Sequence, residues 1–128
     1  MAHFVLEYSA NIDRETLSAQ TLFEKLHNAA METGIFPLKG LRSRAHRCND
    51  FRIADGNPAH IFVHLSVLIG AGRSEEDKAN AAKLIFDVFQ QHFAPCFSSR
   101  GVALSFEMKE LEPTLKYNKN NIENYLGE

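Results

Sequence analysis

The most regular pattern in the chain lies between residues 60 and 69, where alternate positions from Ile61 to Ile69 are all aliphatic. Side chains two apart share one face of a β-strand, so this segment predicts a strand with one fully buried face. Phe62 and Leu68 on the opposite face predict burial there as well. Shorter apolar or alternating runs predict three further strands, at residues 4–8, 41–46 and 102–111.

Two other segments have the spacing of amphipathic helices. The first starts after Ser18, a possible N-cap, and stops at Gly34. Its apolar positions are Leu22, Phe23, Leu26, Ala29 and Ala30. The second starts at Ser74, is followed by three acidic residues that favour a helix N-terminus, and ends near Pro95. Its apolar positions are Ala82, Ile85, Phe86, Phe89 and Phe93.

The order strand, helix, strand occurs twice, with the Asp55-Gly56-Asn57-Pro58 turn between the two occurrences. It predicts an α/β (α+β) fold, with two βαβ units forming one mixed sheet and two helices on one face. We expect a single domain over residues 1–128, with halves at about 2–55 and 60–112 and a polar tail at 113–128. Apolar residues on the uncovered sheet face favour self-association.

Composition adds mainly exclusions. The chain of 128 residues has 14 basic and 16 acidic side chains, which gives no overall field that would attract nucleic acid or an anionic membrane. The sequence has no charged leader and no apolar run of the roughly 20 residues that a membrane helix needs. Cys48 and Cys96 lie in no metal or CxxC spacing, and two free thiols favour a cytoplasmic location.

Basic residues are concentrated between Lys39 and Arg52, where the local charge is +4, whereas the rest of the chain carries −6. Arg42 and Arg44 lie two apart on a predicted strand, so both guanidinium groups can meet a small carboxylate from the same face. A solvated face, or an edge strand protected by charge, explains the same pattern equally well. No aromatic recognition motif accompanies these residues, so we expect no nucleic-acid partner.

A second candidate anion site is the Gly70-Ala71-Gly72-Arg73-Ser74 turn between strand and helix, where Arg73 stands beside backbone N–H groups. A simple tight turn is the alternative. Phe36 and Phe106 are candidates for an apolar pocket wall, although phenylalanine is more often a core residue. His60 and His64 share a strand face without a third ligand at metal spacing, so we expect no metal or cofactor.

Five segments together resemble the 5-carboxymethyl-2-hydroxymuconate delta-isomerase family of the tautomerase superfamily. They are GIFPLKGLRSR at 34–44, FVH at 62–64, IGAGRS at 69–74, ALSFE at 103–107 and EPTL at 112–115. The resemblance covers essentially the whole chain. It implies a tautomerase-like fold, a homotrimer, and cofactor-free isomerisation of an unsaturated dicarboxylate in the catabolism of aromatic compounds.

In that family the general base is an amino-terminal proline, exposed when the initiator methionine is removed, and arginines hold the substrate carboxylates. The resemblance places Ala2 at the position of the base and Arg42, Arg44 and Arg73 in the carboxylate and polarising roles. An α-amine titrates near 7.7–8.0, so an exposed Ala2 amine could carry a proton, without the proline ring that fixes its direction. The sequence therefore predicts an isomerase of a keto or enol dicarboxylate, and the alternative is a non-catalytic relative that binds small carboxylates.

Overall fold

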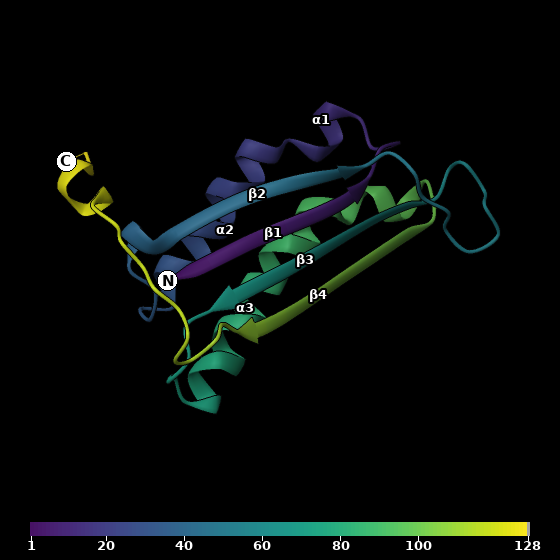
Figure 1. Ribbon diagram of the computed structural model, residues 1–128. Coiled ribbons are helices and arrows are strands. Elements are labelled where there is room, and N and C mark those ends of the chain that lie inside the picture. The colour runs from purple at the N-terminus through teal and green to yellow at the C-terminus, as the bar shows by residue number, and fades with distance from the viewer. Residues whose placement is uncertain (128) are drawn as a thin grey trace.

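The computed structural model describes residues 1–127 and contains a four-stranded sheet in the order β2-β1-β3-β4 (Figure 1). β1 (Ala2–Ser9) is parallel to β2 (Leu41–Cys48), and β3 (Ile61–Ile69) is parallel to β4 (Val102–Glu110). The two pairs meet where β1 lies antiparallel to β3. The predicted mixed sheet and its connections are therefore confirmed, and β1 and β2 extend slightly beyond their predicted bounds.

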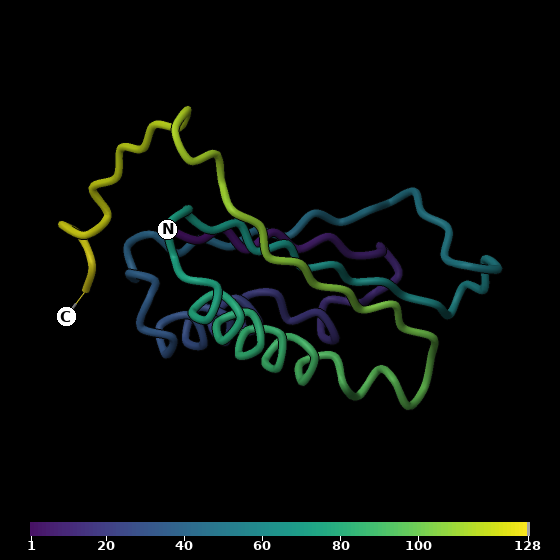
Figure 2. Tube along the Cα trace, turned by 90° about the horizontal axis from the view of Figure 1, so that it is seen from below, coloured from purple at the N-terminus to yellow at the C-terminus, as the bar shows by residue number. Residues whose placement is uncertain are grey.

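The main helices α2 (Ala19–Glu32) and α3 (Glu75–Phe93) both lie on one face of the sheet, as predicted (Figure 2). A one-turn helix α1 (Arg14–Leu17), which the sequence pattern did not predict, precedes α2. Within residues 1–127, no helix is long and apolar enough to cross a bilayer. The short 3-10 helices are η1 (Leu38–Gly40), η2 (Ala94–Ser98) and η3 (Ile122–Tyr125).

The hydrophobic core lies between the sheet and the two main helices. The aliphatic side chains at alternate positions of β3, from Ile61 to Ile69, are fully buried on this side. Burying one such side chain typically contributes about 1.5–3 kcal/mol, so this strand anchors the fold. Phe62 and Leu68 on the opposite face are only half-buried, so the predicted burial on both faces is incomplete within one chain.

A serine side chain caps the start of α3 but not the start of α2, which corrects the prediction for Ser18. Ser74 caps α3 as predicted, because its hydroxyl accepts a hydrogen bond from the backbone N–H of Asp77. Ser18 stands at the start of α2 but does not cap it with its side chain. It has a left-handed backbone with φ 42° and donates its hydroxyl to the carbonyl of Glu15, because α1 ends there.

The buried faces of the helices are close to those predicted. In α2 the buried residues are Leu22, Leu26, Ala29 and Ala30, while Phe23 is half-buried. In α3, Ala81 rather than Ala82 is buried, because the helix is rotated slightly from the predicted stripe. α3 ends at Phe93, and η2 with Pro95 follows directly, as expected of a proline.

The polar tail after β4 runs past the amino-terminal end of β1 and rises on the side away from the helices (Figure 2). Two contacts tie it to η1: Lys39 pairs with Glu123 at 3.1 Å, and the Asn120 amide donates to the Lys39 carbonyl at 3.0 Å. Large apolar side chains of the tail are nevertheless exposed, with Leu115 at 78% and Tyr117 at 94%. The tail therefore contributes to the surface around the start of β1 rather than to the core.

Candidate active site

The start of β1 lies inside the sheet, between a strand on each side. Ala2 is aligned with Leu41 of β2 and with Ile69 of β3, and it is fully buried. Met1 continues into the space beside Gly40, where a Cβ atom would lie only 3.0 Å from the Met1 Cα. A glycine at position 40 therefore allows this close approach. The sheet fixes the direction in which the chain end points.

Three cations face the amino group of Met1: Arg42 at the start of β2, Arg73 after β3, and Lys116 in the tail. Partial burial lowers the pKa of this amino group below its ordinary value, and the positive charges of Arg73, Lys116 and Arg42 lower it further. An amine in this place therefore loses its proton at a lower pH than an exposed chain end does. Sequence reasoning missed Lys116 because nothing in the tail signals that it folds back to β1.

Arg73 is held in a fixed orientation. Its Nε and Nη2 donate to the Ile35 carbonyl at 3.2 and 2.8 Å, and its Nη1 donates to the Gly70 carbonyl at 2.9 Å. Its guanidinium carbon lies 4.8 Å from the centre of the Phe36 ring, a cation–π distance. The turn that allows this includes Gly72 with φ 110°. The structure thus brings together Arg73 and Phe36, two candidate site residues whose contact was not predicted.

Arg42 and Arg44 extend from the same face of β2, as their spacing predicted, and both contact His3 of β1. The closest approaches to the imidazole are 3.1 Å from Arg42 Nη2 and 3.2 Å from Arg44 Nη1. Burial and then the charges of Arg42, Arg44 and the chain-terminal amine lower the pKa of His3, so it is neutral at pH 7. His3 is a site residue that we did not predict.

Phe106 does not lie with the other predicted site residues in this chain. It is aligned with Leu65 in the middle of β3 and packs on the helix side of the sheet. Its ring centre is 5.8 Å from that of Phe86 on α3. The alternation of β4 directs this side chain toward the helices, so within one chain Phe106 is a core residue and not a wall of the pocket. Phe106 therefore follows the general tendency of phenylalanine to pack with the core.

A cavity of about 300 Å³ opens beside the chain end. Its lining combines the start of the chain with the tail, and consists of Met1, Arg42, Asn118, Lys119, Asn120, Asn121 and Ile122. The amide and ammonium groups of the tail are donors suited to oxygen-rich ligands. The sequence analysis missed these tail residues, because a polar run such as Asn118 to Asn121 is typical of a solvated extension.

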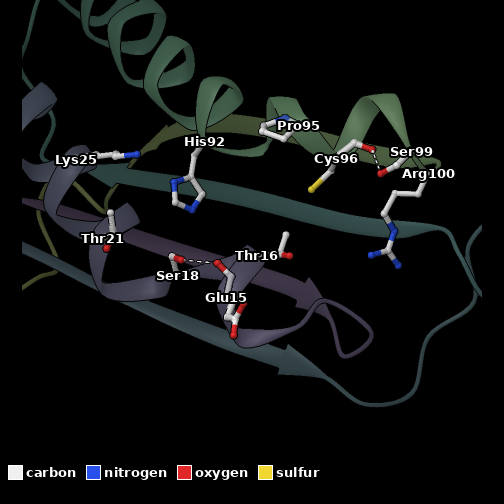
Figure 3. Close-up of a pocket in the computed structure, with 10 residues that line it drawn as sticks. All are labelled: Glu15, Thr16, Ser18, Thr21, Lys25, His92, Pro95, Cys96, Ser99 and Arg100. Carbon is white, nitrogen blue, oxygen red and sulfur yellow. Dashed lines mark hydrogen bonds between the residues drawn. The ribbon is translucent and has the colours of Figure 1, made fainter.

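A larger cavity of about 500 Å³ lies in the helix layer, between the start of α2 and the end of α3 (Figure 3). None of the predicted site residues lines it, and its cations Lys25 and Arg100 share it with the carboxylate of Glu15. The Nε2 of His92, which lines the cavity, donates a hydrogen bond to the Leu17 carbonyl at 2.8 Å. Its mixed charge makes it a weaker candidate than the start of β1.

No group of three or more His, Cys, Asp or Glu side chains in the described part of the chain is arranged to hold a metal ion. The groups gathered at the start of β1 are an amine of lowered pKa and nearby arginines. Such an amine can accept and return a proton at neutral pH, and the arginines can hold anionic groups beside it.

Comparison with known proteins shows the family of the chain. The profile of the 5-carboxymethyl-2-hydroxymuconate isomerase family matches residues 2–126. An Escherichia coli protein named 5-carboxymethyl-2-hydroxymuconate Delta-isomerase is 44% identical over 122 residues, covering 95% of this chain and 96% of the relative. The crystal structure of a 5-carboxymethyl-2-hydroxymuconate isomerase from Deinococcus radiodurans R1 has a TM-score of 0.89 and 38% identity, covering 98% of this chain and 95% of that one.

A more distant solved structure, described as a fused 4-OT symmetric trimer, has a TM-score of 0.64 at 17% identity and covers 91% of this chain and 93% of that one, and it shows the shared fold. The family profile and the close relatives match over nearly all of the chain. The chain belongs to the 5-carboxymethyl-2-hydroxymuconate isomerase family.

Proposed function

We propose that this protein is an isomerase that moves a proton within an unsaturated keto or enol carboxylate such as 5-carboxymethyl-2-hydroxymuconate. Its relatives are named for that compound, in which muconate supplies two carboxylates and the carboxymethyl group a third. The observation that carries the proposal is the setting of the chain end: burial and the charges of Arg73, Lys116 and Arg42 lower the pKa of the Met1 amine, and removal of Met1 leaves the Ala2 amine one residue away, at the start of β1. This arrangement suits a polyanionic substrate and a proton-transferring base.

The proposed base is the amine of Ala2 after Met1 has been removed. With Met1 in place, the nitrogen of Ala2 belongs to an amide and cannot accept a proton. Once free, the amine removes a proton from one position of the conjugated substrate, the double bonds shift, and the ammonium returns the proton to a carbon elsewhere in the system. One bond to hydrogen breaks and another forms, so no oxidant or reductant is needed.

The other predicted residues have supporting roles in this mechanism. Arg42 and Arg44 bind a substrate carboxylate, and Arg73 polarises the oxygen at the reacting end of the substrate, where negative charge develops. Phe36 supports Arg73 from below and forms an apolar wall. Because Arg73 is held by three hydrogen bonds before substrate binds, it lowers the barrier without having to reorganise during the reaction.

The proposed working form is a homotrimer. Support comes from the uncovered sheet face, where Phe62 and Leu68 are half-buried, and from the exposed apolar side chains of the tail. A second support is the trimer described for a structure of the same fold. Light scattering coupled to size-exclusion chromatography checks this proposal, and the expected mass is three times 14.4 kDa. A monomer at micromolar concentration would contradict it.

The test of the reaction follows the loss of enol absorbance with 5-carboxymethyl-2-hydroxymuconate. The protein used is shown by intact mass to lack Met1, and protein that retains Met1 serves as the control. We expect turnover only without Met1, because the extra residue displaces the amine by about 3.8 Å and fills the space beside it. If the Ala2 protein gives no rate above buffer while an Ala2→Pro variant does, the proposal fails for this chain.

A non-catalytic carboxylate-binding protein was the alternative. It is not favoured, because the relatives that match over nearly the whole chain are named as isomerases. Calorimetric binding of a carboxylate without turnover by either the Ala2 or the Ala2→Pro protein would be the result that supports it.

A further inference from the structure

His3 lies between two guanidinium groups, and its position cannot satisfy both. Arg42 Nη2 is 3.1 Å from His3 Nε2, and Arg44 Nη1 is 3.2 Å from His3 Nδ1. Arg42 Nε is 3.3 Å from each of the two ring nitrogens. The register explains the arrangement, because His3 is directly aligned with Arg42 and faces the same side of the sheet, away from the helices.

The cluster of His3, Arg42 and Arg44 has more hydrogen-bond donors than acceptors. Arginine can only donate hydrogen bonds, and a neutral imidazole has one accepting nitrogen and one N–H. Whichever ring nitrogen carries the proton, its N–H faces a guanidinium N–H, so two donors meet at about hydrogen-bond distance. Only an acceptor placed between them can satisfy both donors. A carboxylate oxygen is such an acceptor, and it also balances the positive charge.

The surroundings of His3 provide no such acceptor. No ion pair between side chains of residues 1–127 involves Arg42 or Arg44. The charged groups that act on His3 are these two arginines from β2 and the chain-terminal amine of its own strand, and β3 places the apolar Leu68 opposite it. Every charge near His3 is therefore positive. Because Arg44 is exposed, water can accept from these donors in the free protein, and a carboxylate is the acceptor that would also balance the positive charge.

We propose that His3 is a third carboxylate-binding residue of the site, and that it takes up a proton when a carboxylate binds between it and the arginines. The proposal rests on the carboxylate-binding part of the proposed function and adds a residue and a coupling that this function does not require. In the free protein, burial and then the surrounding cations lower the pKa of His3, which favours the neutral ring. A bound carboxylate neutralises these cations and accepts a hydrogen bond from the ring, which favours the imidazolium.

The sign of the coupling can be stated. Between the pKa of His3 in the free protein, which is lowered, and its higher pKa in the complex, binding takes up a proton. In that range carboxylate affinity falls as the pH rises, by at most about tenfold for each pH unit for one coupled proton. Above the higher pKa, His3 stays neutral in both states and the affinity becomes independent of its titration.

The test measures binding of adipate, the saturated six-carbon dicarboxylate, by titration calorimetry at pH 7 in HEPES and in Tris. Adipate has no double bond to isomerise, so the result does not depend on turnover. A difference in the observed enthalpy between the two buffers gives the number of protons taken up. We expect a measurable fraction of one proton per site for the unmodified protein, and affinity that decreases from pH 6 to pH 8.

Two variants separate the parts of the proposal. His3→Gln keeps an N–H donor and an acceptor but does not titrate, so we expect affinity within about threefold at pH 8 and loss of the proton uptake. His3→Phe also removes the donor, and we expect affinity to fall by about tenfold or more, as for loss of a charge-assisted hydrogen bond. His46→Gln, an exposed histidine beyond Arg44 on the same face of β2, is the matched control and should bind like the unmodified protein.

Two results would overturn the proposal. If His3→Gln takes up as many protons as the unmodified protein, the uptake belongs to the chain-terminal amine or another group. If adipate does not bind the correctly folded protein, as judged by its thermal unfolding, there is no carboxylate site at His3. Loss of proton uptake in His3→Gln supports the proposal even if the isomerase assay shows no turnover, so the two proposals can fail separately.

Discussion

Replacing Arg73 with lysine tests whether the geometry of this side chain, and not only its charge, supports the reaction. Arg73 donates three N–H groups to the Ile35 and Gly70 carbonyls and lies over the Phe36 ring. A lysine keeps the positive charge but has a single nitrogen at the end of a flexible chain. It cannot hold both carbonyls in the positions that the planar guanidinium reaches.

The size of the effect follows from these contacts. Losing one charge-assisted hydrogen bond typically costs about 1.5–3 kcal/mol, and the partial exposure of Arg73 reduces this to about 1–2 kcal/mol. For a chain of this length, that loss lowers the melting temperature by roughly 3–10 °C. A misplaced charge at the reacting end should lower kcat/KM by about ten- to a hundredfold, which corresponds to roughly 1.4–2.8 kcal/mol of transition-state stabilisation.

The assay compares kcat/KM for the enol substrate and the thermal unfolding of Arg73→Lys and Arg100→Lys. Arg100 also donates to a backbone carbonyl, that of Ala59 at 2.8 Å, but it lies at the other end of the sheet. We expect Arg100→Lys to retain full activity. The reasoning is refuted if Arg73→Lys matches the unmodified protein in both measurements, or if Arg100→Lys loses as much activity.

Three further predictions concern the chain-terminal amine, the core and a helix cap. The Ala2 amine is expected to share the burial and the cations that lower the pKa of the Met1 amine, so kcat/KM should rise with pH, with a midpoint below 7.7–8.0, and level off above it. Lys116→Gln removes one of these cations and should move the midpoint to higher pH, whereas an unchanged profile would exclude Lys116 from this role. Phe89→Ala removes a fully buried ring whose centre is 5.7 Å from that of Phe93. Urea unfolding should show that the free energy of unfolding falls by about 3–5 kcal/mol, and a fall below about 1 kcal/mol would mean that the core closes around the cavity. Ser74→Ala removes the side-chain cap of α3 and should cost about 1 kcal/mol in the same experiment, and no change would show that the cap contributes nothing measurable.

The arrangement of strands and main helices was predictable because each element has a simple period and its own boundary signal. The aliphatic alternation of β3 and the Ser74 cap of α3 both appear in the structure where the sequence pattern indicated. Helix α1 was not predictable in this way, because four residues are too few for a period to appear. It displaces the expected Ser18 cap.

The site was only partly predictable, because several of its residues are far apart in the sequence and meet only in the folded chain. The spacing of Arg42 and Arg44 is a property of one strand, so their common face followed from the sequence. The contact of these arginines with His3 depends on the register between two strands separated by a helix, and the approach of Lys116 depends on the path of the tail. Phe106 illustrates the opposite difficulty, since an aromatic residue in a strand fits both a pocket and a core.

The antiparallel meeting of β1 and β3 gives the sheet an approximate two-fold symmetry, in which the start of β3 corresponds to the start of β1. The two starts differ chemically. β3 begins at Ile61, directly after His60, so its first nitrogen is a peptide amide, whereas β1 begins at residue 2, next to the chain-terminal amine. When two βαβ units are joined in one polypeptide, the number of terminal amines for each βαβ unit is therefore half of what it would be if each unit were a separate chain. The proposed trimer then has six βαβ units but only three chain-terminal amines that could transfer a proton. The residues around His60, at the start of β3, need not take part in proton transfer.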